Sequence, residues 1–377
     1  MRAPMRSSAT SSPSACSSCR GADMDFTFSE EQRMMAAAVR ELLDDVCSPA
    51  AIRRAVEGRE DLSADRWARY CELGLPGVLA PEAAAGLGLE ATDFVLIAEE
   101  CGRAAVPEPL VEHAGVAVPL LAELAGTPRA IEVLDGAASG VLRLGIGHPV
   151  NPFVLGGGGC DFVLLMADDE VHLLARSSIG VTVEPSVDAS RRLARVEWAP
   201  ASQTQVAGGV AALAAVERAF QRGALYAAAE SLGLAQRMME LGVAYACERK
   251  QFGRQIGSYQ GLKHHFASAQ VKLEFARPVV YAAVTRAGDV DDRAAAAISH
   301  AKLAAVAAAD ACSRIAMQAH GAMGYSWEVD LHFYMKRAWA LAGVWGDRSF
   351  HSRRVQQLLG SGRLPIGPDQ TFVRTGD

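Results

Sequence analysis

The sequence predicts an α+β fold that is mostly α-helical, with a small β-domain between two helical domains. Residues 24 to about 125 have the pattern of helices joined by short Gly/Pro loops. Residues 130 to 205 change to short β-type runs between turn residues, and residues 206 to 360 return to apolar positions three and four apart. We therefore expect four parts, which are a leader (1–23), an N-terminal helical domain (24–128), a middle β-domain (129–205) and a C-terminal helical domain (206–377).

The first 23 residues are rich in Ser, Ala and Arg and lack the apolar stretch of a secretory signal. We expect this leader to be disordered, and a transit peptide is the alternative. At Met24 the character changes, because Ser29 followed by Gln32 forms the capping-box pattern that opens an amphipathic helix. Met24 is therefore the expected natural start.

Composition excludes several classes of protein. The chain has 377 residues, of which 50% are hydrophobic and 21% charged, and its formal net charge is −6. A chain with this net negative charge lacks the excess of basic residues that is typical of nucleic-acid-binding proteins. The eight cysteines form neither a disulfide framework nor a complete zinc site, which indicates a reducing, cytoplasmic location. Apolar stretches fall short of the roughly 18 residues that a membrane span requires, so none is expected.

Two glycine-rich stretches look like nucleotide motifs, but their contexts do not fit. GLGLEA at Gly86–Ala91 matches a dinucleotide fingerprint, yet it lies between predicted helices instead of after a strand. We expect a turn that leads into a helix. GGGG at 156–159 lacks the Lys and Ser/Thr of a phosphate loop, and we expect a hairpin or surface connection there. The β-type runs are VLRLGI, DFVLLMA, VHLLA, GVTVE and ARVEWA.

Two segments of the C-terminal region carry unusual polar and glycine patterns. In ERKQFGRQIGSYQ, Arg249 and Phe252 come where a long helix ends, and helix capping by the basic residues is one explanation. In QAHGAMGYSWEVDLHFYMKRA, Gly321 and Gly324 permit close backbone approach beside Gln318. A close helix crossing would explain that second pattern equally well.

Taken together, the motifs resemble the acyl-CoA dehydrogenase family from Met24 to about Gly360. The matching segments, in order, are FSEEQRMMAAAVRELL, GLPGVLAPEAAAGLGLEATDFVLIAEECGRAAVPEPL, DASRRLARVEW, LGLAQRMMELGVAYACERKQFGRQIGSYQGLKHHFA and QAHGAMGYSWEVDLHFYMKRA. The resemblance implies a C-terminal four-helix bundle and FAD bound at a subunit interface. It also implies which residues hold the adenosine and pyrophosphate end of the neighbour's FAD, namely Arg249, Phe252, Gln260, Gln318 and Gly321, with Ala322 in place of a second glycine.

The family's reaction is α,β-desaturation of a CoA thioester, in which a glutamate removes the α-proton and the flavin accepts the β-hydrogen. Both family positions for that glutamate lack it here. At the first position Trp345 replaces the glutamate, and it is followed by Gly346 and by Asp347 where Thr is expected. At the second position Gly223 replaces the glutamate, and Ala224 stands in place of an arginine. The family's TEPxAGSD loop and WITN strand, which contact the flavin ring, are also missing.

The residues for the adenosine end of FAD are thus present, whereas the glutamate and the flavin-ring contacts are missing. This asymmetry suggests one subunit of a heteromeric dehydrogenase of lipid metabolism. The resemblance then implies a related partner subunit that supplies the catalytic glutamate, in an α2β2 assembly. It further implies a bulky or steroid-derived acyl-CoA substrate and an electron-transfer flavoprotein as acceptor. Two alternatives remain open. One is a self-sufficient homo-oligomer with Asp347 as base, and the other is a flavin-free structural subunit.

Overall fold

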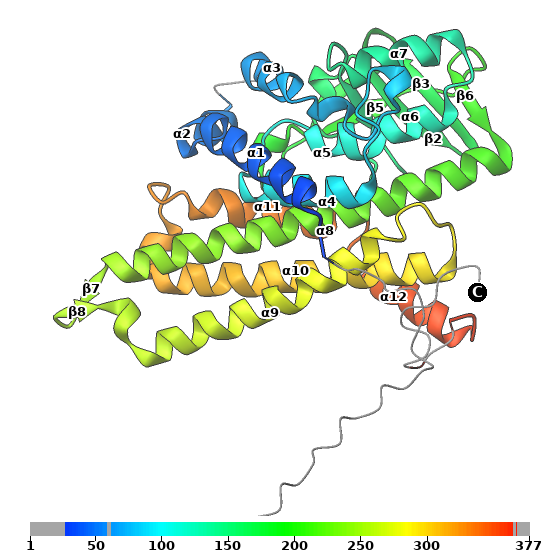
Figure 1. Ribbon diagram of the computed structural model, residues 1–377. Coiled ribbons are helices and arrows are strands. Elements are labelled where there is room, and N and C mark those ends of the chain that lie inside the picture. Colours follow the sequence, from blue (N-terminus) through cyan, green and yellow to red (C-terminus); the bar gives the residue numbers. More distant parts are fainter. Residues whose placement is uncertain (1–26, 59–61, 365–366, 368–377) are drawn as a thin grey trace, which may run out of the picture.

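The computed structural model describes residues 27–58, 62–364 and 367, and its elements follow the order helices, strands, helices (Figure 1). The leader predicted over residues 1–23 and the expected start at Met24 lie outside the described residues. The predicted capping box is present, because Ser29 Oγ accepts from the N–H of Gln32 (3.1 Å) and Gln32 Oε1 accepts from the N–H of Ser29 (2.9 Å). The mostly helical α+β fold is confirmed.

The N-terminal part is a layer of helices, and the GLGLEA stretch forms a loop that enters one of them, as predicted. Gly86 sits so close to the carbonyl of Ala80 that a side chain there would overlap it. One helix was not predicted, since α7 begins at Pro128 behind the N-cap Thr127 and continues to Ala138, inside the region expected to hold β runs. The helices are α1 (Glu30–Val46), α2 (Pro49–Val56), α3 (Ala64–Glu72), α4 (Ala91–Arg103), α5 (Leu110–Glu112), α6 (Val118–Leu124) and α7 (Pro128–Ala138).

The middle part contains two small sheets, and all five predicted β runs form strands. A four-stranded sheet has the order β1-β2-β3-β6, with β1 and β2 parallel and the other pairs antiparallel; β4 and β5 form an antiparallel pair. The GGGG stretch forms a short 3-10 turn before β2. The strands are β1 (Leu144–Ile146), β2 (Phe162–Ala167), β3 (Glu170–Ala175), β4 (Gly180–Val183), β5 (Ala194–Glu197) and β6 (Gln205–Gly208), the last of which was not predicted.

The C-terminal part is a helical bundle in which α8, α9 and α10 lie side by side (Figure 1). Its helices are α8 (Gly209–Glu248), α9 (Gln260–Val284), α10 (Asp292–His320), α11 (Leu331–Gly343) and α12 (Arg348–Gly360). Within the described residues, only the segment Asp292–Tyr325 is long and apolar enough to cross a membrane, and half of its apolar window is buried inside the bundle. Core helices of folded domains commonly have this character.

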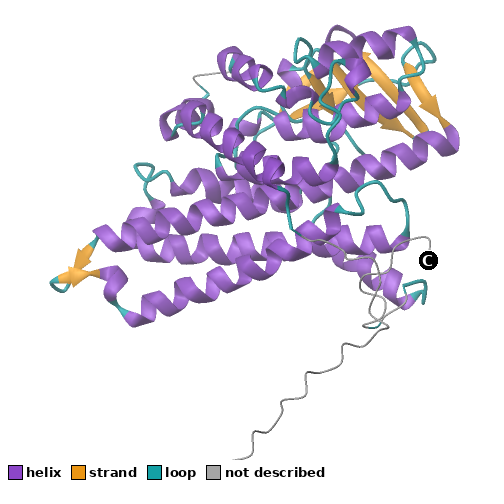
Figure 2. Ribbon diagram, in the orientation of Figure 1, coloured by secondary structure: helices purple, strands orange, loops and turns teal. Residues whose placement is uncertain are grey.

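A hairpin of two very short strands joins α8 to α9. Strands β7 (Lys250–Gln251) and β8 (Arg254–Gln255) pair antiparallel around Phe252 and Gly253. Figure 2 shows this hairpin at one tip of the bundle and the other strands gathered at the opposite end of the molecule. The sequence predicted the end of the helix here but not the hairpin.

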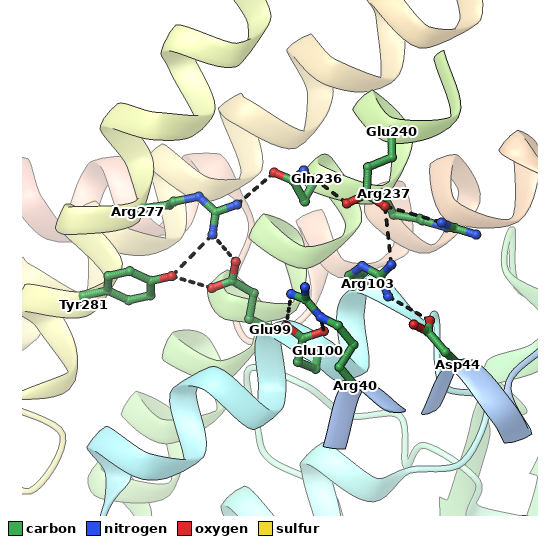
Figure 3. A network of polar contacts seen from close by, with 10 residues as sticks. All are labelled: Arg40, Asp44, Glu99, Glu100, Arg103, Gln236, Arg237, Glu240, Arg277 and Tyr281. Carbon is green, nitrogen blue, oxygen red and sulfur yellow. Dashed lines mark hydrogen bonds and ion pairs between the residues drawn. The ribbon is translucent and has the colours of Figure 1, made fainter. Parts of the chain in front are cut away.

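A polar network fixes the N-terminal helices onto the bundle (Figure 3). Glu99 of α4 pairs with Arg277 of α9 and accepts from the hydroxyl of Tyr281 (2.6 Å), while Arg277 also donates to Gln236 Oε1 of α8 (3.0 Å). Burial raises the pKa of Glu99, and the Arg277 charge opposes this shift. These contacts satisfy a buried carboxylate at the junction of three helices, so they orient the helices relative to one another.

Candidate functional site

The first candidate region is the tip of the bundle, where α8 ends and α9 begins. Arg249 is the C-cap residue of α8; its N–H donates to Tyr245 O and its carbonyl accepts from the N–H of Ile256, both at 2.8 Å. Its side chain is exposed, as are those of Phe252 and Gln260, the latter being the first residue of α9. The backbone of Arg249 therefore does the capping, and its exposed guanidinium makes no hydrogen bond or ion pair with the described residues.

Phe252 occupies a costly conformation. Its φ is +51° and that of the following Gly253 is +80°, as expected for a two-residue hairpin turn that would normally favour Asn-Gly or Gly-Gly. An aromatic residue in the left-handed region costs of order 1 kcal/mol or more. The ring is 92% exposed, so within the described chain it recovers almost nothing from burial. Such strain is typical of a residue kept for binding.

The second predicted segment lies beside the first. The rings of Tyr245 on α8 and His320 on α10 stack with their centroids 4.2 Å apart, and this contact brings the ends of the two helices together. Gln318 is exposed on the last turn of α10, and Gly321 follows with φ +60° and ψ −136°, a conformation that favours glycine. Ala322 is exposed in the next turn. The six predicted cofactor contacts thus lie on neighbouring segments at one end of the bundle. We call this set, Arg249, Phe252, Gln260, Gln318, Gly321 and Ala322, the bundle-tip cluster.

The two positions where the family would place its catalytic glutamate lie in contact with each other. A Cβ built on Gly223 of α8 would lie 2.8 Å from Cε3 of Trp345, and closer still to Cδ2 and Cε2. The Trp345 side chain is only 1% exposed and its φ is +55°. The indole therefore fills the space beside α8, and it fits only because residue 223 has no side chain.

Other rings complete this packing. His148 of the β1–β2 connection lies 5.7 Å from the Trp345 ring, Phe220 lies 5.6 Å from His148, and His351 of α12 stacks on Phe220 at 6.0 Å. Burial lowers the pKa of both His148 and His351 to about 4, which keeps them neutral near pH 7. His351 is further held by Ser299 Oγ and Trp345 O. The region is a packed aromatic cluster without a carboxylate among these side chains.

Asp347, the weak candidate base, has a local structural role. It is the N-cap of α12, and its Oδ1 accepts from the N–H of Phe350 at 2.7 Å. Its side chain is exposed, whereas Trp345 two residues earlier is buried. These contacts favour the interpretation of Asp347 as a helix cap.

A buried ionic cluster joins the three parts of the chain near α8. Arg337 of α11 pairs with Asp188 and donates to Val106 O (2.8 Å) and Ser190 Oγ (2.9 Å). Glu230 of α8 is only 6% exposed. Burial and the neighbouring Glu112 raise its pKa to about 8. An acid in an alanine-rich helix gives no sequence signal of such burial.

Comparisons with known proteins agree with this architecture. The family described as "Acyl-CoA dehydrogenase, N-terminal domain" matches residues 29–140, and "Acyl-CoA dehydrogenase, C-terminal domain" matches residues 213–357. The chain is 33% identical over 333 residues to "Acyl-CoA dehydrogenase IpdE2" of Mycolicibacterium smegmatis, a match that covers 87% of this chain and 98% of the relative.

Two solved structures have a similar fold. That of the ChsE4-ChsE5 complex from Mycobacterium tuberculosis has a TM-score of 0.78 at 21% identity, and that of the Tcur3481-Tcur3483 steroid ACAD has a TM-score of 0.77 at 22% identity. Each similarity covers 89% of this chain and 99% of the other.

Proposed function

The chain belongs to the acyl-CoA dehydrogenase family, and from this premise we propose that it is one subunit of a heteromeric, FAD-dependent acyl-CoA dehydrogenase. A related partner subunit supplies the catalytic glutamate and the contacts to the flavin ring. The observation that carries the proposal is the contact between Gly223 and Trp345. Both family positions for the base are occupied by this packing, so a carboxylate cannot enter either one without displacing the indole.

FAD is the cofactor of the family, and when bound it accepts the hydrogen that leaves the substrate. The bundle-tip cluster fits its adenosine and pyrophosphate end. Arg249 offers a charged fork that matches a diphosphate, and Phe252 offers an exposed flat ring for the adenine. Gly321 has no described atom within 4 Å of a built Cβ, so a ligand can approach its backbone. In this arrangement the chain's own residues bind and orient the cofactor.

The substrate proposal rests on similarity. The chain resembles a structure described as a steroid ACAD, and the fold neighbour ChsE4-ChsE5 is a complex of two different chains. We extend these properties to this chain as a bulky acyl-CoA substrate and an α2β2 assembly with a related subunit. An electron-transfer flavoprotein is the proposed electron acceptor.

The test is to express the full chain alone and together with a glutamate-containing family member encoded beside it. Bound FAD is measured by absorbance after gel filtration, and acyl-CoA turnover is measured with an artificial electron acceptor. We expect stoichiometric flavin and turnover only in the mixture, and loss of flavin on Arg249→Ala. Arg254→Ala is the matched control, since Arg254 lies in the same hairpin but packs over Tyr259 at 4.0 Å.

Each alternative has its own outcome. Flavin and turnover in the lone chain would overturn the heteromer and favour the self-sufficient enzyme. No flavin in either preparation, with a stable complex of the two chains, would favour a structural subunit.

A further inference from the structure

The bundle-tip cluster comes from two separate stretches of the chain, which we call its two arms. The α8 arm, residues 249–260, runs from the end of α8 through the hairpin to the start of α9. The α10 arm, residues 318–322, is formed by the last turn of α10 and the turn that follows it. One ligand can use both arms only if their separation is fixed, because binding groups must be held within about 0.5 Å of their productive positions.

A pair of stacked rings outside the cluster connects the two arms. Tyr245 lies on α8 one turn before Arg249, and His320 directly precedes Gly321 at the end of α10. Their ring centroids are 4.2 Å apart and their planes are nearly parallel, at 22°. Offset stacking of this kind is a favourable arrangement for aromatic rings. The stack therefore lies at the point from which both arms leave the bundle.

The His320 ring is fixed on its own helix. Its Nδ1 lies 2.8 Å from the carbonyl oxygen of Ala316, so this nitrogen carries a proton and donates it. The side chain is only 6% exposed. At Ala316 the two helices also approach closely, because a Cβ built on Gly242 of α8 would lie 3.2 Å from the Cα of Ala316. Tyr245 therefore packs against a ring that cannot easily move.

The ring of Tyr245, and not its hydroxyl, makes this connection. The side chain is half-buried, and the hydroxyl forms no hydrogen bond with the described residues. The carbonyl of Tyr245 caps the helix by accepting from the N–H of Arg249 (2.8 Å), and a substitution of the side chain leaves that bond in place. Tyr245→Phe therefore keeps the contact, whereas Tyr245→Leu removes the flat ring and retains apolar bulk.

We propose that Tyr245 and His320 are positioning residues for the flavin, and that their stack sets the separation of the two arms. This inference rests on the function proposed above, because the arms need a fixed separation only if one cofactor touches both. The two rings act through their neighbours in the chain, Arg249 and Gly321. Without the stack, the cofactor would have to restrict the movement of the arms as it binds, and its affinity would fall by the cost of that ordering.

The first test separates flavin affinity from turnover in the complex of this chain with its glutamate-containing partner. FAD is titrated into the complex stripped of flavin, and its dissociation constant is measured from the recovery of turnover. We expect Tyr245→Leu to raise the dissociation constant about tenfold. Turnover at saturating FAD should stay unchanged, because the partner holds the reacting ring. A variant that only loses folded protein would instead lower turnover at every FAD concentration.

Conservative variants provide the matched controls. Tyr245→Phe should bind FAD like the unmodified chain. His320→Phe keeps a flat ring but loses the bond to Ala316, so it should raise the dissociation constant by less than threefold. Equal losses in Tyr245→Phe and Tyr245→Leu would overturn the proposal, because the hydroxyl would then contact the flavin directly.

The second test requires no flavin. Backbone hydrogen exchange is followed by mass spectrometry on the full chain alone, since a loosened segment exchanges faster. We expect Tyr245→Leu to speed exchange about fivefold or more in both residues 250–258 and residues 318–326, and Tyr245→Phe to leave it unchanged. Strands β2 and β3, at the opposite end of the molecule, should exchange as before in both variants (Figure 2).

The outcomes distinguish this inference from the proposed function. Unchanged exchange in Tyr245→Leu would overturn the inference, and so would faster exchange at an unchanged dissociation constant for FAD. In both cases the unmodified complex still binds FAD and turns over, so the proposed function stands. If the unmodified complex binds no FAD, the proposed function fails and the positioning role fails with it.

Discussion

The contact between Gly223 and Trp345 predicts an unusual double-mutant cycle. Gly223→Ala places a methyl carbon within 2.8 Å of the indole, and overpacking of this kind costs about 1–3 kcal/mol. Trp345→Ala empties a site that is 1% exposed, which costs about 3–5 kcal/mol. In the emptied site the alanine at 223 meets no indole, and the higher helix propensity of alanine stabilises α8 by about 1 kcal/mol. The double variant should therefore be more stable than Trp345→Ala alone.

The free energy of unfolding is measured for all four proteins by urea denaturation, followed by far-ultraviolet circular dichroism. The expected coupling is about 1–3 kcal/mol, which is the overpacking contribution alone, because the propensity gain is present in both backgrounds and cancels in the cycle. Gly343→Ala is the control, because this helical glycine has no described atom within 4 Å of a built Cβ and should lose no stability. An equal cost of Gly223→Ala in both backgrounds would show that the indole does not lie against α8, and the argument for a blocked base position would fail.

Three further predictions concern other contacts. Asp347→Ala removes the N-cap of α12, which should cost about 1 kcal/mol of stability and leave turnover of the assembled enzyme unchanged. Arg277→Met leaves the buried carboxylate of Glu99 without its cation, and the free energy of unfolding should fall by about 3 kcal/mol. His113, fully buried with a pKa lowered to about 4, should make stability depend on pH. The unfolded chain takes up the proton first, so the contribution of His113 to stability is constant above about pH 6.5, falls by up to about 3 kcal/mol toward pH 4 and then levels off.

The structure gives the cause of the histidine effect and its control. His113 Nδ1 accepts from the N–H of Leu144 (2.9 Å), so a proton there would face another donor. His113→Gln should reduce but not abolish the pH dependence of urea denaturation between pH 6.5 and 4, because His148 and His351 have similarly lowered pKa values, whereas His300→Gln, at an exposed position, should leave it unchanged. An unaltered slope in His113→Gln would contradict the assignment.

The other two variants have their own contradicting outcomes. For Asp347→Ala, a tenfold loss of turnover at unchanged flavin content would identify a catalytic group. For Arg277→Met, a fall of less than 1 kcal/mol in the free energy of unfolding would contradict the proposed junction.

Local signals in the sequence were sufficient for much of the fold. The capping box at Ser29 and the five β runs depend on neighbouring residues, and the structure confirms them. Strand β6, helix α7 and the hairpin β7–β8 were missed. Two-residue strands are too short to show a period, and α7 begins at Thr127-Pro128, at the border of the region whose composition favours strands.

The site was only partly predictable for a different reason. Motif spacing identified Gly223 and Trp345 separately as positions without a glutamate, but spacing cannot show that two residues so distant in the chain touch. The burial of Glu230 and of Tyr226 likewise depends on tertiary packing. A helical acid or tyrosine has the same sequence pattern whether it faces water or a neighbouring helix.

The cofactor-binding half and the catalytic half of the family site differ physically in this chain. The difference bears on the alternative of a flavin-free structural subunit. At the bundle tip, Phe252 keeps an exposed ring in a left-handed conformation that glycine or asparagine would adopt at lower cost. A chain with no ligand at this end would gain stability by replacing that residue, so a purely structural subunit does not account for it. At the base position, Trp345 has instead gained buried packing that a catalytic carboxylate would have to give up. The conformational cost at Phe252 is thus present where a cofactor can bind, whereas at Trp345 stable packing takes the place of the catalytic group. This is the pattern expected of a subunit that contributes binding to an active site completed by its partner.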